Sequence, residues 1–249
     1  MSWLTNMMSS SIGKKFLMGL TGLFLCSFLV VHLTGNLLLL KNDGGVAFNQ
    51  YSEFMSSSGN IPIRIMEVGL FLFFILHIVN GIKLWIENKK ARPVKYAMNN
   101  PANNSSVFSR SMFVSASVVF IFLIVHLNTF FVDHRIFGDG VKKEIEIINH
   151  ATQETEKLLF STASGLTMAE SVMKAFENPF YSLFYVLAMI LLGYHLNHGF
   201  QSAFQTFGIN NKKYTPVIKG LGMGFAILMS VGYSVIPIFF FLKSYLGGN

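Results

Sequence analysis

Five long apolar segments dominate the pattern of hydrophobic and polar positions along the chain. They cover residues 16–40, 63–86, 108–132, 180–207 and 217–242. Each is long enough for a helix that crosses a bilayer, which needs about 20 mainly apolar residues. Hydrophobic residues make up 52% of the chain and charged residues only 12%, a composition typical of integral membrane proteins. The pattern predicts an all-α membrane protein, with five transmembrane helices in a single domain over residues 1–249.

The first apolar segment is too long for the core of a signal peptide, and no small-residue cleavage site follows it. We therefore expect it to remain in the mature protein as the first span. The one cysteine, Cys26, lies inside this span and excludes an intrachain disulfide and any Cys-rich metal site. The net charge of +7 does not indicate nucleic-acid binding, because the basic residues cluster beside the spans rather than on one polar face.

The positions of these basic residues predict the orientation. Lys14 and Lys15 precede the first span, a cluster from Lys89 to Lys95 joins the second and third, and Lys212 and Lys213 lie between the fourth and fifth. Because Lys and Arg mark the cytoplasmic side of short loops, the N-terminus is expected inside and the C-terminus outside. The cluster from Lys89 to Lys95 could also receive an acidic partner or lie against anionic lipid of the bilayer.

Four histidines lie in four different spans: His32, His77, His126 and His195. With a helical rise of about 1.5 Å per residue, His32 and His126 lie roughly 10–12 Å below the outer surface, and His77 and His195 roughly 22 Å below it. The local sequence gives the same pairs, because Val-His-Leu surrounds the upper two, whereas a polar residue and a glycine follow the lower two. Ionisable rings in hydrocarbon are costly and rarely idle. The sequence therefore predicts two functional histidine pairs.

Two pairs of imidazoles can supply the axial ligands of two bis-histidine haems. The alternatives are zinc or copper, a proton relay, or histidines that only hydrogen-bond between helices. Zinc requires ligands at one depth, and a proton relay usually includes carboxylates, which the apolar centres of the last three spans lack. Haem is therefore favoured. The second nitrogen of each ligand then needs a polar partner, for which the nearby candidates are Ser27, Thr34, Ser117 and Thr129.

The fourth span contains two histidines three residues apart, His195 and His198. In the repeated motif, His195 aligns with His77 and His198 aligns with Asn80. We therefore predict that His195 is the ligand, and that His198 and Asn80 are polar groups that hold a haem propionate or a neighbouring backbone. The glycine beside each of them would let a flat macrocycle approach closely.

The segments Ser11-Ile-Gly-Lys-Lys15, Leu20-Thr-Gly-Leu-Phe24 and His32-Leu-Thr-Gly-Asn36, together with the run from His195 to Gly208, resemble the cytochrome b membrane anchor of succinate dehydrogenase and fumarate reductase. The resemblance is to the branch with one five-span polypeptide and two haems b, as in bacteria that use menaquinone. It covers nearly the whole chain and implies a multi-pass location in the bacterial cytoplasmic membrane.

The resemblance implies that His32 and His126 bind the iron of an outer haem, and that His77 and His195 bind the iron of an inner haem. It also implies the function, which is to relay electrons between a cytoplasmic iron–sulfur subunit, itself joined to a flavoprotein subunit, and menaquinone. The chain would then be the quinone-reacting subunit of respiratory complex II, with the dicarboxylate site on another subunit. A dimer of the whole complex is compatible with the resemblance.

The family has an acidic residue beside its quinone site, and Glu53 matches that place, which implies a role in handling the quinone proton. Gln50 and Tyr51 could donate hydrogen bonds to a quinone carbonyl. The alternative for Glu53 is an ordinary solvated carboxylate. Some members have a further acidic residue near the ligand in the fourth span. This chain has only Leu192, Gly193 and Tyr194 there, so no such proton path is expected.

Two other functions remain open at this point. One is the cytochrome b subunit of a hydrogenase or formate dehydrogenase, and the other is a transporter or structural membrane protein without haem. The stretch from Lys142 to Glu177 mixes apolar and charged residues, and we expect short surface helices there that end at Asn178-Pro179. His134 and His150 are expected to be solvated residues of this outer region.

Overall fold

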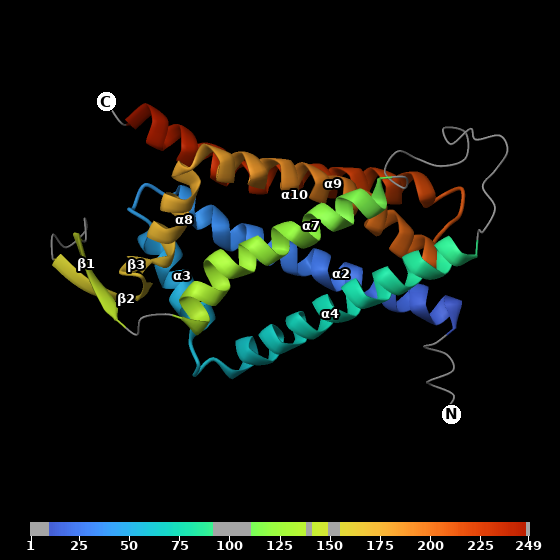
Figure 1. Ribbon diagram of the computed structural model, residues 1–249, viewed down its shortest axis with the longest axis horizontal. Coiled ribbons are helices and arrows are strands. Elements are labelled where there is room, and N and C mark those ends of the chain that lie inside the picture. The colour runs from blue at the N-terminus through green and yellow to red at the C-terminus, as the bar shows by residue number, and fades with distance from the viewer. Residues whose placement is uncertain (1–9, 92–110, 138–140, 149–154, 248–249) are drawn as a thin grey trace. The chain divides into compact units, whose positions relative to one another are not determined.

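The computed structural model describes residues 10–91, 111–137, 141–148 and 155–247 (Figure 1). Part of the predicted inner basic loop, including Arg92, Lys95 and Arg110, lies outside the described residues, as does His150.

Five of the described helical segments are long and apolar enough to cross a membrane. They are α2 (Ser11–Asn36) with the short 3₁₀ helix η1 (Leu37–Leu40), α4 (Ile61–Lys90), α7 (Met112–His126) with η2 (Leu127–Ile136), α9 (Pro179–Thr206) and α10 (Thr215–Gly247). Large apolar side chains remain exposed on them, as on α4, where Ile65 is 68% and Val68 is 70% exposed. Such surfaces are expected where a helix faces lipid. The chain is therefore a predominantly helical, multi-pass membrane protein, and this part of the prediction is confirmed.

The third of these segments changes its helical form at a predicted ligand. α7 ends at His126, and the chain continues from Leu127 to Ile136 as a π-helix, η2. π-helical backbone is rare and is usually confined to a single turn, often at functional sites. The wider turn begins directly after His126 and carries the helix four residues beyond the predicted end of the span at Val132.

The prediction of short helices in residues 142–177 was wrong for the described residues up to Thr167. The structure has an antiparallel sheet there, made of β1 (Lys142–Ile148), β2 (Thr155–Ala163) and β3 (Leu166–Thr167), in the order β1-β2-β3. The reason is visible in Lys-Lys-Glu-Ile-Glu-Ile-Ile, where polar and β-branched residues alternate with the period of a strand. The last ten residues are helical, as α8 (Met168–Glu177), and the helix ends directly before Asn178-Pro179, as predicted.

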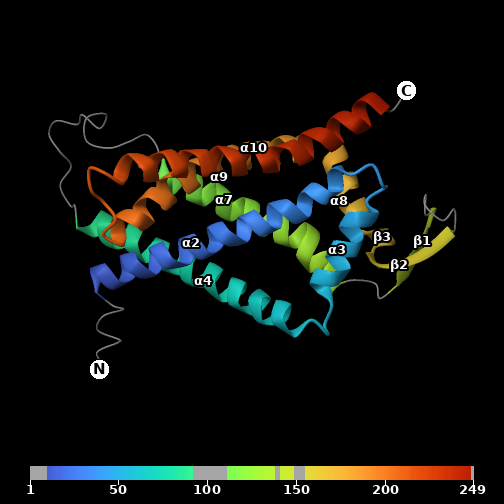
Figure 2. The ribbon, with the colours of Figure 1, turned by 180° about the vertical axis from the view of Figure 1, so that it is seen from behind.

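Residue contacts divide the chain into two compact units. Unit 1 comprises residues 1–31, 64–117 and 190–230, and unit 2 comprises residues 32–63, 118–189 and 231–249. In unit 1, the first part of α2 runs beside the second half of α4 (Figures 1 and 2). The two helices approach closely at Gly81 of α4, where an added Cβ would lie 3.3 Å from Met18 Cε of α2.

In unit 2, the helix α3 (Val46–Ser56) packs against α8 (Figure 2). The buried side chain of Asn49 joins them, because its Nδ2 donates to Thr167 Oγ1 at 3.1 Å and its Oδ1 accepts from the Ala169 backbone N–H at 2.9 Å. Thr167 also forms a capping box with Glu170, which satisfies backbone donors at the start of α8. The core of the unit, which includes Phe176 and Tyr185, is built on this support.

Candidate functional site

Unit 1 contains one predicted histidine pair. His77 of α4 and His195 of α9 lie beside each other, with ring centres 6.3 Å apart and ring planes at 66°. Gly22 of α2 lies against this pair, since a Cβ added there would be 3.4 Å from His77 Cε1. An alanine at position 22 would therefore make an ordinary van der Waals contact with the ring of His77.

Unit 2 contains the other pair. His32 of α2 and His126 of α7 have ring centres 5.8 Å apart and ring planes at 83°. The structure thus brings together the same partners that span depth and local sequence predicted. The role of these four residues as haem ligands stays a prediction.

The geometry of both pairs fits a shared metal ion. Two imidazoles on opposite sides of a metal, each bound through a metal–nitrogen bond of about 2 Å, hold their ring centres about 6 Å apart. Across the described residues, no three His, Cys, Asp or Glu side chains converge on one point. A structural zinc site uses four ligands, whereas an axially ligated haem needs two. The donor set therefore fits haem and does not fit zinc.

The second nitrogen of His77 contacts a threonine. Thr21 Oγ1, which is completely buried on α2, lies 3.1 Å from His77 Nδ1. The same hydroxyl donates its one proton to the backbone carbonyl of Leu17 at 2.8 Å. With its proton on Leu17, Thr21 accepts from His77, and this hydrogen-bond pattern assigns the ring proton to Nδ1. This tautomer leaves the Nε2 lone pair of His77 free for a metal.

The second nitrogen of His126 lies 3.4 Å from the hydroxyl of Tyr185 on α9. Three of the predicted partners, Ser27, Ser117 and Thr129, bond to other groups. Ser27 and Ser117 bond to carbonyls of their own helices, at Phe24 and Phe113. Thr129 is connected to Tyr185 only through another tyrosine.

Sequence reasoning missed both Thr21 and Tyr185. One signal for Thr21 was available, because it precedes His32 by eleven residues, which is about three helical turns and places both residues on one face of α2. The contact between Thr21 and His77 joins residues 56 positions apart, and hydrophobic periodicity carries no information about such a pairing.

The remaining groups of unit 1 lie close to the pair. His195 Nδ1 is buried and has no hydrogen-bond partner among the described residues. Asn80 is buried, and its Nδ2 donates to the Lys14 backbone carbonyl at 2.7 Å, so it contacts a neighbouring backbone, the second of its two predicted roles. His198 is half-buried, one turn further along α9.

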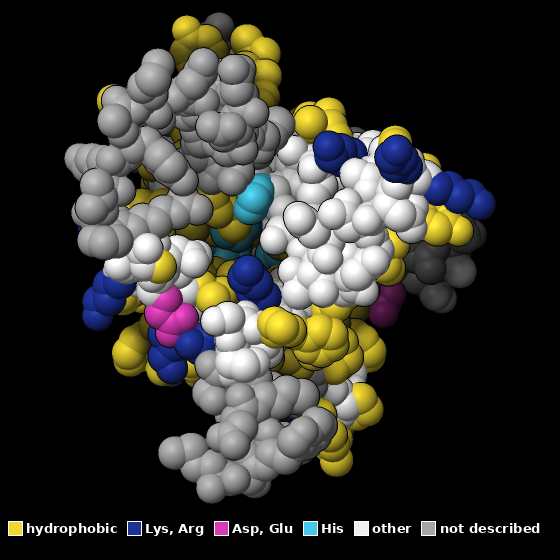
Figure 3. All heavy atoms as spheres, turned by 90° about the vertical axis from the view of Figure 1, so that its right-hand side faces the viewer, with side chains coloured by type: hydrophobic (Ala, Val, Ile, Leu, Met, Phe, Trp, Pro, Cys, Tyr) yellow, Lys and Arg dark blue, Asp and Glu magenta, His cyan; other side chains and the backbone are white. Residues whose placement is uncertain are grey.

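Figure 3 views the end of unit 1 where α2 begins and α4 ends, and histidine side chains are visible there in a hollow with Lys and Arg around it.

The predicted quinone residues of α3 contact different elements. The carboxylate of Glu53 accepts a hydrogen bond from the Ser161 backbone N–H of β2. The ring of Tyr51 lies against Gly35 of α2, where an added Cβ would be 2.4 Å from its Cε1. Burial raises the pKa of Tyr51, so its hydroxyl stays protonated and able to donate. Gln50 is exposed. The structure therefore does not gather Glu53 and Tyr51 at one point.

His134 was predicted to be solvated, and the structure corrects this. It lies on η2, half-buried, with its Nε2 2.9 Å from Ser171 Oγ of α8. The extension of the helix by η2 is the reason, because it keeps His134 in regular structure opposite α8 rather than in a loop.

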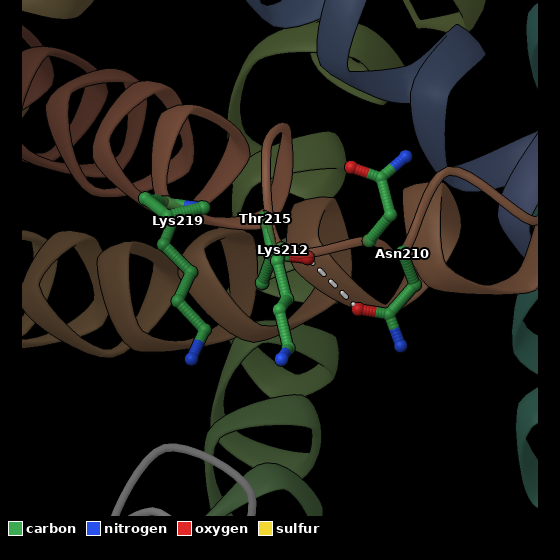
Figure 4. A pocket seen from close by; sticks show the side chains of 6 residues that line it. Asn210, Lys212, Thr215 and Lys219 are labelled. Atoms are coloured by element: carbon green, nitrogen blue, oxygen red, sulfur yellow. Dashed lines mark hydrogen bonds between the residues drawn. The ribbon is translucent and has the colours of Figure 1, made fainter.

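A wide hollow of about 850 Å³ lies between the end of α9 and the start of α10. It is lined by polar residues that include Lys212 and Lys219, whose side chains run side by side in Figure 4. Asn210 Oδ1 accepts a hydrogen bond from Thr215 Oγ1 at 3.0 Å there. None of the predicted site residues lines this hollow, so it is a basic surface separate from the histidine pairs.

Comparison of the chain with models of protein families, with curated proteins and with solved structures returns no match.

Proposed function

We propose that this protein is the di-haem cytochrome b membrane anchor of a succinate:quinone oxidoreductase, which relays electrons between a cytoplasmic iron–sulfur subunit and menaquinone. The observation that supports this most strongly is that the four histidines of the spans form two pairs. Each pair comes from two different spans, and the ring-centre distances of 6.3 and 5.8 Å suit one metal ion between two imidazoles. Five membrane-spanning helices agree with such an anchor.

The residues of the chain would hold the cofactors as follows. His77 and His195 would bind one haem iron, and His32 and His126 the other. Thr21 keeps the proton of His77 on Nδ1 and so presents Nε2 to the metal. The buried Nδ1 of His195 has no hydrogen-bond partner among the described residues, which is explained if that nitrogen itself binds a metal. A haem held by two imidazoles supplies one-electron transfer.

The proposed partners are a flavoprotein and an iron–sulfur subunit on the cytoplasmic face. The end of unit 1 where α2 begins supports this, because it carries Lys14, Lys89 and Lys90 together with the lysines of the α9–α10 connection. Glu87, which pairs with Lys14, is the acidic residue described nearby. A basic face favours an acidic partner through electrostatic steering. It also supports the proposed orientation, with the N-terminus in the cytoplasm.

A quinone contact is proposed at Tyr51 rather than at Glu53. The Tyr51 hydroxyl stays protonated and belongs to the same unit as His32, whereas the Glu53 carboxylate already accepts from the Ser161 backbone. Glu53 retains a role in proton handling in this proposal, because its second oxygen can still accept a proton.

The test is purification of the full chain from its native membrane in mild detergent. We expect two soluble subunits to copurify, one with flavin and one with iron–sulfur centres, and succinate to reduce the haem of the complex. Copurification with a hydrogenase or a molybdenum-containing formate dehydrogenase would replace the proposal with the related cytochrome b function. A haem-free preparation would overturn both.

A further inference from the structure

A row of three hydroxyl groups, of which that of Tyr185 belongs to a buried residue and the other two to half-buried residues, extends from His126 in unit 2. Tyr185 lies 3.4 Å from His126 Nδ1, Tyr181 lies 2.9 Å from Tyr185, and Thr129 lies 3.1 Å from Tyr181. Thr129 then donates to the backbone carbonyl of Val125 at 3.0 Å. We refer to Tyr185, Tyr181 and Thr129 as the hydroxyl chain.

The direction of every hydrogen bond in the hydroxyl chain follows from its last member. A carbonyl oxygen can only accept, so Thr129 uses its one proton on Val125 and must accept from Tyr181. Tyr181 has then used its proton, and Tyr185 must donate to Tyr181. Tyr185 in turn can only accept from His126, whose proton is thereby placed on Nδ1 and whose Nε2 is left with a lone pair.

The packing around Tyr185 fixes the position of its hydroxyl. The residue is only 5% exposed. Phe122 and Phe176 meet its ring edge to face, with ring centres 4.8 and 4.9 Å away and both interplanar angles at 79°. The Tyr181 ring centre is 4.7 Å away. A ring held on three sides cannot swing its hydroxyl to another partner, and a buried hydroxyl without partners would be costly.

We infer that Tyr185 is a positioning residue that sets the strength of His126 as a metal ligand through the hydroxyl chain, and so lowers the reduction potential of the haem in unit 2. This rests on the proposed function. An acceptor on Nδ1 makes an imidazole a stronger electron donor to its metal, which favours the oxidised state. Tyr185 is a better acceptor because it donates to Tyr181, since hydrogen bonds in a row polarise one another. In unit 1, the Nδ1 of the corresponding ligand, His77, has a single hydroxyl acceptor, Thr21.

The experiment is a redox titration of both haems in the full chain, with each haem assigned by its loss in His126→Ala or His77→Ala. Tyr185→Phe should raise the reduction potential of the unit 2 haem. The reduced-to-oxidised ratio of that haem should rise several-fold, up to about tenfold, which corresponds to about 59 mV for one electron. Tyr181→Phe should raise it less, because Tyr185 then remains as an unpolarised acceptor. The unit 1 haem should not change. Tyr245→Phe, which removes a hydroxyl from an exposed tyrosine of unit 2, is the matched control.

Two results would overturn the inference while leaving the proposed function intact. One is an unchanged potential in both Tyr185→Phe and Tyr181→Phe with two haems still bound. The other is an equal shift of both haems, which would indicate a general disturbance. If Tyr185→Phe loses its haem through misfolding, Tyr181→Phe alone decides the test. A wild-type chain without haem would instead overturn the proposed function, and the inference with it.

Discussion

At the scale of single residues, the account depends on which nitrogen of each histidine carries the proton. Thr21 and Tyr185 are different residue types on different helices, yet both can only accept from an Nδ1–H. The two contacts therefore leave the same nitrogen, Nε2, of His77 and His126 with a lone pair. The sequence predicted the four rings because a histidine among apolar residues is conspicuous. It did not predict their hydroxyl partners, because threonine and tyrosine are common in membrane helices.

Thr21→Val tests the contact of His77. The change keeps the shape of the side chain but leaves a buried Nδ1–H without an acceptor, which costs about 1–3 kcal/mol in the free energy of unfolding. The measurement is denaturant unfolding in detergent, with Ser27→Ala as control. That hydroxyl bonds only to Phe24 of its own helix and is exposed, so its loss should change stability by less than about 0.5 kcal/mol. Equal stability of the two variants would contradict the assigned role of Thr21.

His195 and His198 provide a second test at this scale. The ring centre of His195 lies 6.3 Å from that of His77, whereas His198 lies one turn further along α9. His195→Ala should lower the haem content from two to one per chain, and His198→Ala should retain two, with at most a shift in potential. Haem content of each purified variant is the measurement. Loss of a haem in His198→Ala with retention in His195→Ala would reverse the ligand assignment.

At the scale of elements, the spans were predictable and the outer region was predictable only in part. A membrane helix requires a long apolar run, and such runs are visible without any knowledge of partners. The β1–β2 hairpin was missed because its alternation covers only seven residues, Lys142–Ile148, in a stretch that also contains helix-forming residues. The π-helical form of η2 was not predictable, since no residue pattern specifies it.

Gly35 in α2 tests how α3 is held in place. An added Cβ would lie 2.4–2.6 Å from two ring atoms and the hydroxyl oxygen of Tyr51, so Gly35→Ala should displace α3 and lower the free energy of unfolding by about 1–3 kcal/mol. Gly224→Ala in α10 is the matched control, because nothing lies within 4 Å of its added Cβ. It should be neutral or stabilise the helix by up to about 1 kcal/mol. The account of α3 fails if Gly35→Ala is as stable as this control.

The start of α8 gives a prediction of pH dependence. Partial burial acts to raise the pKa of Glu170, but bonds from Lys143 and Thr167 outweigh it, and the pKa is lowered. The ionised Glu170 therefore stabilises the folded state fully above the unfolded pKa, which is about 4.3 for glutamate. This stabilisation is lost as the pH falls through the lower pKa of the folded state. Glu170→Gln should reduce the fall in melting temperature between about pH 5 and about pH 3. An identical acid profile in wild type and variant would rule out this contribution.

At the scale of the whole molecule, the central claim is that four histidines form two metal-binding pairs. Each pair belongs to one of the two compact units, and each has a protonated Nδ1 on one of its rings. The pairing could be predicted from depth and local sequence because a helix converts residue number into distance along its axis. The haem, the soluble partners and the quinone are proposals.

The measurement that tests this claim most directly is haem b content per chain by the pyridine haemochrome method, in the wild type and in the four single His→Ala variants. The account predicts two haems in the wild type and one in each of His32→Ala, His77→Ala, His126→Ala and His195→Ala. It also predicts that the first and third of these variants lose the same haem, and the second and fourth the other. A folded wild-type chain that binds no haem when haem is supplied would contradict the account.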